Sequence, residues 1–120
     1  MAANFQYSIQ TASSPDKAKI VSCSGDIDES NYRILEECFE ELFNDSKLKF
    51  VVFDLENLDY MNSKVIGVFV GWHSKFVESG KIFVFSQTKD HIFDIINLVG
   101  LTGVIECFDT NEEALLSFEN

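Results

Sequence analysis

The chain has 120 residues, of which 46% are hydrophobic, and a formal net charge of -11 at pH 7, so we expect a single domain over residues 1–120. Its negative charge excludes the electrostatic surface of a nucleic-acid-binding protein. We expect no membrane insertion, because the longest strongly apolar run, Val65 to Trp72, is far shorter than the ~20 residues that a spanning helix requires.

The first predicted elements form a hairpin. Phe5, Tyr7 and Ile9 alternate with polar residues, which predicts a half-buried strand. A turn cluster at residues 13–16 precedes a second predicted strand at residues 19–23. Because the link between the two strands is short, we expect them to pair antiparallel.

A predicted loop at residues 25–28 leads to the first helix. Asp28 is its expected N-cap, with Glu29 in the first turn. Apolar side chains recur on one face of this helix and glutamates occupy the other. The expected apolar face consists of Tyr32, Leu35, Phe39, Leu42 and Phe43.

The middle of the chain predicts two buried strands around a long helix. The apolar run at residues 50–55 is typical of a central strand that is covered on both faces. A helix from about Ser63 to Glu78 follows, and Gly80 is expected to end it in the left-handed conformation. Residues 82–85 predict the second fully buried strand.

The last third predicts a helix, a short strand and a closing helix. Apolar residues from Ile92 to Val99 recur at helical spacing, and Gly100 ends that helix. Residues 104–108 predict the strand, and Thr110 with Glu113 forms a capping box for the closing helix. This order predicts an α/β fold: a mixed, mostly parallel sheet of about five strands, with an antiparallel edge hairpin and about four helices.

Cys23, Cys38 and Cys107 are far apart and lack metal-ligand spacing, which predicts free thiols in a reducing cytosol. The amino terminus does not have the pattern of a signal peptide, so we expect a cytoplasmic protein. Phosphate-loop, dinucleotide-binding and nucleophile-elbow motifs are missing, and His73 and His91 lie in separate predicted helices. We therefore expect a protein that is not an enzyme and that holds no cofactor or metal.

Ser63 stands between a predicted strand and a predicted helix, where backbone N–H groups are unpaired and the helix dipole favours negative charge. Two interpretations of this junction stay open. Either Asn62 or Ser63 is the N-cap of the helix and contributes ~1 kcal/mol to stability, or the junction holds a phosphate. Lys64 puts a cation in the first turn, where the dipole disfavours it. A phosphate on Ser63 would explain why a cation stands there, and so would an ion pair between Lys64 and Asp59 or Glu56.

Three further residues belong to the helix that begins at Ser63. Gly67 and Gly71 are expected to allow close packing of this helix on the sheet. Trp72 lies on a helix with two largely apolar faces. Either both faces are buried within the domain, or Trp72 is partly exposed and anchors a partner or a second copy of the chain.

Together these segments resemble the STAS domain family, named for sulfate transporters and anti-sigma factor antagonists, and within it the free-standing bacterial antagonists. The similarity covers nearly the whole chain. It is carried by the loop SGDID, the segment VVFDLENLDYMNSKVIGVFVG with Asp54, Ser63 and Gly67, the turn and strand ESGKIFVF, and the stretch LVGLTGVIECFDTNEEAL.

The resemblance implies a partner switch that regulates transcription through protein binding. In such antagonists an anti-sigma factor that is also a serine kinase phosphorylates the serine heading the second helix. The unphosphorylated form binds that kinase, and a dedicated serine phosphatase resets it. Ser63 matches the phosphorylated position, and Asp28 matches a segment beside it. Asn62 stands where the family usually has aspartate, and Lys64 where it usually has a small residue.

The expected partner-binding residues are thus Asp28, Asn62, Ser63, Lys64 and Trp72. Two other functions stay open. A STAS module without the phosphoswitch would be a scaffold or an accessory subunit, for example of a transporter ATPase, and Asn62 favours it. A small-molecule or nucleotide sensor would use the helix N-terminus at Ser63 as its phosphate site. The motifs also leave homodimer formation open.

Overall fold

The computed structural model describes residues 4–13 and 17–119. Its elements are β1 (Phe5–Thr11), β2 (Ala18–Ile27), α1 (Tyr32–Phe43), β3 (Phe50–Met61), α2 (Ser63–Glu78), β4 (Ile82–Ser86), α3 (Asp90–Leu98), the 3-10 turn η1 (Leu101–Gly103), β5 (Cys107–Phe108) and α4 (Asn111–Glu119). The predicted order is confirmed, with η1 as an addition. The predicted turn at 13–16 falls mostly on residues 14–16, outside the described residues.

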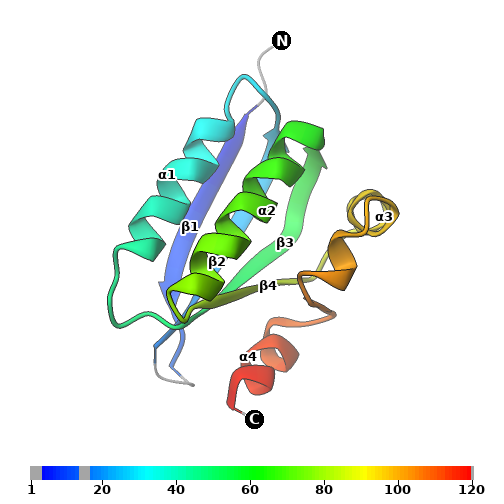
Figure 1. Ribbon diagram of the computed structural model, residues 1–120. Helices are drawn as coiled ribbons and strands as arrows, with labels where there is room; N and C mark the ends of the chain where they lie inside the picture. The colour runs from blue at the N-terminus through cyan, green and yellow to red at the C-terminus, as the bar shows by residue number, and fades with distance from the viewer. Residues whose placement is uncertain (1–3, 14–16, 120) are drawn as a thin grey trace.

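The sheet has five strands in the order β1-β2-β3-β4-β5. β1 pairs antiparallel with β2, and the other neighbouring strands pair parallel. This confirms the expected α/β fold with an antiparallel edge hairpin (Figure 1). No helix in the described part of the chain is long and apolar enough to cross a bilayer.

The helices divide between the two faces of the sheet. Alternate residues of β3 point to opposite faces, so Val51 and Phe53 join one core while Phe50 and Val52 join another. The larger core lies under α1 and α2, which run side by side in Figure 1, and it includes residues of α3. The smaller core includes Ala114 of α4. The sheet therefore holds α1 and α2 as a pair, and their outer surfaces are free to form a site.

An aromatic cluster joins α1, α2 and the sheet at the centre of the larger core. The Phe39 ring lies 4.9 Å from the Phe53 ring, 5.2 Å from Phe83 and 5.3 Å from Trp72, measured between centroids. Phe39 is fully buried. Its position on α1 makes it the side chain that ties this helix to both α2 and the sheet.

The predicted ends of β2 and β3 are both too early, because the two strands pair with each other beyond residues 23 and 55. Residues 25–27 are not a loop: β2 continues to Ile27 because β3 itself runs on to Met61 and offers a pairing partner. Gly25 accommodates the irregular register there with a φ of 93°, and a Cβ on it would lie 1.9 Å from the Asn4 carbonyl oxygen.

The later strands are shorter or more exposed than expected. β4 is not fully buried, because Ile82 is 49% exposed. β5 keeps only two of the five predicted residues. The cysteines are free, and Cys23 and Cys38 are buried while Cys107 is half-buried. Burial raises the pKa of Cys38 to about 12, so this thiol is held in its protonated form.

Candidate functional site

Asn62 makes the turn from β3 into α2. Its side-chain Oδ1 accepts a hydrogen bond from the Val65 N–H at 3.3 Å, so Asn62 is the N-cap and Ser63 is the first helical residue. Ser63 is exposed, and its hydroxyl makes no hydrogen bond to any described residue. The structure therefore leaves this hydroxyl open to another molecule, at the end of the helix that favours negative charge.

The loop between β2 and α1 lies against this junction. The Asn62 amide donates a short hydrogen bond to Oε2 of Glu29. An aspartate at position 62 would instead bring a second carboxylate against Glu29, and the two like charges would repel each other. This contact explains why an asparagine suits position 62. Glu29 was not among the predicted site residues, because only the folded loop brings it to α2.

Asp28 does not cap α1, and Glu29 is not in its first turn, because the helix begins at Tyr32 with Asn31 as the flanking residue. Asp28 instead organises its own loop. Its Oδ1 accepts hydrogen bonds from the Ser30 hydroxyl at 2.6 Å and from the Ser30 N–H at 2.8 Å. These bonds lower the pKa of Asp28, so the carboxylate stays charged near neutral pH.

Lys64 is accommodated by an aromatic ring. Its ammonium nitrogen lies 4.8 Å from the centroid of the Tyr32 ring at the start of α1, within the range of a cation–π contact. The suggested ion pair between Lys64 and Asp59 is wrong, because Asp59 pairs with Lys89 instead. Lys64 therefore needs no phosphate to explain its position, although its charge remains next to Ser63.

Trp72 is buried rather than partly exposed, with 6% of its surface accessible. Its indole N–H donates to Oε2 of Glu36 at 3.1 Å, and its ring stacks on Phe39. The ammonium of Lys75 lies 4.3 Å from the ring centroid. Trp72 therefore packs within the domain, but the expectation that both faces of α2 are buried is wrong, because Val70 on the other face is 44% exposed.

A surface groove of about 430 Å³ runs along α2 beside these residues. Its lining includes Ser63, Gly67 and Gly71, with Lys64 and Lys75, and Glu36 from α1. Trp72 also lines it, so the indole forms part of the groove wall while packing inward. The groove gives the exposed hydroxyl a shaped surrounding with both positive and negative charge.

Gly67 and Gly71 are not packed on the sheet. Both are exposed, and a Cβ added at either would meet nothing within 4 Å. They lie four and eight residues after Ser63, which puts all three on the same side of α2. We call Ser63, Gly67 and Gly71 the small-residue stripe. No packing contact in the described part of the chain therefore requires glycine at position 67 or 71.

We expect Gly67→Ala and Gly71→Ala each to stabilise the domain by about 0.8–1.0 kcal/mol, because alanine favours an exposed helix interior. The melting temperature, followed by circular dichroism, should rise by roughly 3–5 °C for each. Gly80→Ala is the control: Gly80 has a φ of 80°, so alanine there should destabilise the domain. A fall in stability at position 67 or 71 would mean that these glycines have an internal role.

Comparison with known proteins identifies the fold family. The family model for the STAS domain matches residues 9–114. The chain belongs to the STAS domain family. A crystal structure of an anti-sigma factor antagonist from Mycobacterium paratuberculosis is similar over 98% of this chain and 96% of that one, with a TM-score of 0.85 and 19% identity.

Two further structures have the same STAS fold. The Bacillus cell fate determinant SpoIIAA, in its phosphorylated form, matches 92% of this chain and 99% of its own, with a TM-score of 0.67 and 14% identity. The murine anion transporter Slc26a9 matches 98% of this chain with a TM-score of 0.79 and 12% identity. This chain corresponds to only 22% of that transporter chain.

Proposed function

We propose that this STAS protein is a cytoplasmic anti-sigma factor antagonist that binds an anti-sigma serine kinase and is regulated by phosphorylation of Ser63. The observation that carries the proposal is the exposed Ser63 hydroxyl, which makes no hydrogen bond to any described residue and stands at the start of the small-residue stripe. The likeness in fold to free-standing antagonists supports it, and so does the phosphorylated form of one of them. The protein acts by binding and not by catalysis.

In this proposal the partner lies along the stripe. Glycines at positions 67 and 71 let a partner backbone approach α2 closely, because no side chain stands between them. Lys64, Lys75 and Glu36 border the contact and set its charge pattern. Asp28 and Asn62 hold the loop and the helix start that flank it.

The proposed switch is electrostatic. A phosphoryl group on Ser63 adds about -1.5 to -2 charge to the groove. Ser63 is already exposed and its hydroxyl bonds no residue in the described ranges, so a phosphate there would require no rearrangement of the backbone. The added charge then opposes binding, because the partner would have to desolvate it. A phosphatase that removes the phosphate restores the binding form.

The experiment is incubation with the cognate anti-sigma kinase and ATP, followed by intact-mass and fragment analysis. We expect one phosphoryl group on Ser63 and none on the Ser63→Ala variant. Ser74→Ala is the matched control, because Ser74 is also exposed on α2, and it should be phosphorylated as the parent protein is. No phosphate on Ser63, together with unchanged kinase binding by Ser63→Asp, would contradict the proposal.

A second candidate is a scaffold or accessory subunit without a phosphoswitch. The likeness to part of a transporter chain favours it. Asn62 no longer does so by itself, because its amide bonds Glu29. This candidate expects a pull-down to recover a partner without a kinase fold and Ser63→Ala to have no effect. A sensor function would require a nucleotide to raise the melting temperature.

A further inference from the structure

A second surface feature lies at the other end of β3 from Ser63. A cavity of about 460 Å³ opens where β2 and β3 begin, beside the turn that follows α1. Its walls include Ala18 and Leu48, which are both buried and apolar. This volume is within the range of small-molecule sites, which are mostly apolar with a few placed polar groups.

The charge of this cavity is opposite to that of the chain. Four of the nine Lys and Arg residues line it, namely Lys17, Lys19, Lys47 and Lys49. Asp45 is the one acidic residue in its described lining. With four lysines and one aspartate, the described lining carries a net charge of +3 on a chain whose net charge is -11.

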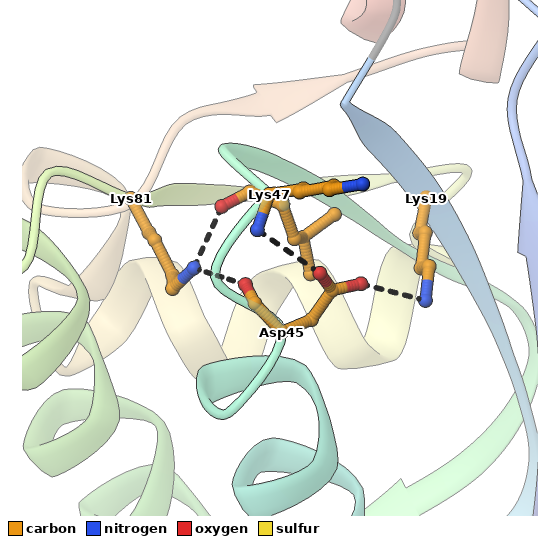
Figure 2. Close-up of polar contacts among 5 residues, drawn as sticks. Lys19, Asp45, Lys47 and Lys81 are labelled. Carbon is orange, nitrogen blue, oxygen red and sulfur yellow. Dashed lines mark hydrogen bonds and ion pairs between the residues drawn. The ribbon is translucent and has the colours of Figure 1, made fainter.

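A buried lysine fixes one wall of the cavity. Lys81 is 4% exposed, and its ammonium donates hydrogen bonds to the carbonyl oxygens of Asp45 and Leu48, at 2.7 Å each. Figure 2 shows Asp45 between Lys81 and Lys19. The Lys17 carbonyl accepts from the Lys49 N–H at 2.9 Å, which joins the start of β2 to the start of β3. The lysine-bearing segments are thus held in place before any ligand arrives.

The lysines are not all neutralised within the domain. Asp45 pairs with Lys19 at 3.1 Å and also accepts from the Lys47 backbone N–H, so its carboxylate is engaged. In the described part of the chain, Lys17, Lys47 and Lys49 make no ion pair. Because all three lysines line the same cavity, an anion bound there would be attracted by each of them.

We propose that this cavity binds a small anion of the diphosphate class, either free or as part of a larger molecule. A diphosphate carries more negative charge than the about -1.5 to -2 of a single phosphoryl group, which suits the +3 of the described lining. Lysine ammonium groups bind phosphate oxygens as point charges. The cavity volume of about 460 Å³ leaves room for an organic group beside the phosphates. The site is independent of Ser63 and of the function proposed above.

The test is a titration of the full chain with inorganic pyrophosphate, followed by amide chemical shifts, with sodium chloride at matched ionic strength as the blank. We expect shifts concentrated at residues 17–19 and 45–49. Lys47→Gln should weaken binding roughly fivefold, and the double variant Lys47→Gln/Lys49→Gln should weaken it further. Arg33→Gln is the control, because it removes a positive charge from an exposed residue of α1 that does not line the cavity, and it should leave binding unchanged.

A parallel titration with ADP separates the sources of the diphosphate group. Tighter binding of ADP than of pyrophosphate supports an organic diphosphate, and tighter or equal binding of pyrophosphate supports the free anion. Shifts spread over the chain, shifts centred on Ser63, or no shift at millimolar pyrophosphate would overturn the proposal. An equal loss of affinity in Arg33→Gln and Lys47→Gln would also overturn it. The amide spectra of the variants show directly whether each one is folded.

Discussion

Phe39→Ala is expected to lower the free energy of unfolding by about 3–5 kcal/mol, the usual cost of deleting a buried phenyl ring. Phe39 is fully buried and contacts rings of α2, β3 and β4. Removing it leaves a cavity between α1, α2 and the sheet that these helices cannot close without moving. Urea denaturation followed by circular dichroism measures the loss.

Phe93→Ala is the matched control for this experiment. Phe93 is 38% exposed on α3, so its loss should cost far less, about 1 kcal/mol or below. A loss of less than about 1.5 kcal/mol for Phe39→Ala would show that the core repacks easily. Because domains are stable by only about 5–15 kcal/mol, the expected loss is a large share of the total. The variant should still fold at low temperature.

Phosphorylation of Ser63 is expected to weaken binding of the anti-sigma kinase about a hundredfold, which corresponds to a repulsion of ~3 kcal/mol. Calorimetric titration of both forms measures the change. The melting temperature of the phosphorylated protein should be equal to or higher than that of the parent protein, because an anion at the first helical residue interacts favourably with the helix dipole. A loss of binding without a loss of stability would show that the phosphate acts at the binding surface and not by unfolding the domain.

Two variants sharpen this second prediction. Gly67→Ala should reduce kinase binding while raising stability, since its methyl group stands on the proposed contact surface. Asn97→Asp adds a negative charge to an exposed residue of α3, outside the groove along α2, and we expect it to leave binding largely unchanged. Equal affinity of the phosphorylated and unphosphorylated forms would contradict the proposed switch.

The sequence predicted α2 well because several local signals agree there. An apolar run at residues 50–55 precedes the helix, a capping residue stands at Asn62, and Gly80 lies just beyond the helix. The end of β2 could not be predicted in this way. Residues 25–27 carry loop-like glycine and aspartate, and they are strand only because β3 is long enough to pair with them. Pairing between distant segments overrides such local preferences.

The same distinction applies to the candidate site. Ser63 and its neighbours were found because they are adjacent in sequence. Glu29, Tyr32 and Glu36 were missed, since each reaches α2 from the preceding loop or from α1. Trp72 was ambiguous because both faces of α2 are apolar. Its burial depends on the stacking partner that α1 supplies, namely Phe39.

The small-residue stripe has a consequence for engineering and for evolution. A screen that rewarded heat resistance alone would replace Gly67 and Gly71 early, since each alanine improves the helix and meets no neighbour. The selected variants would be more stable and, on our proposal, would no longer bind their partner. Separate selections for thermal stability and for signalling would therefore identify the residues of the contact surface. No structure of the complex would be needed.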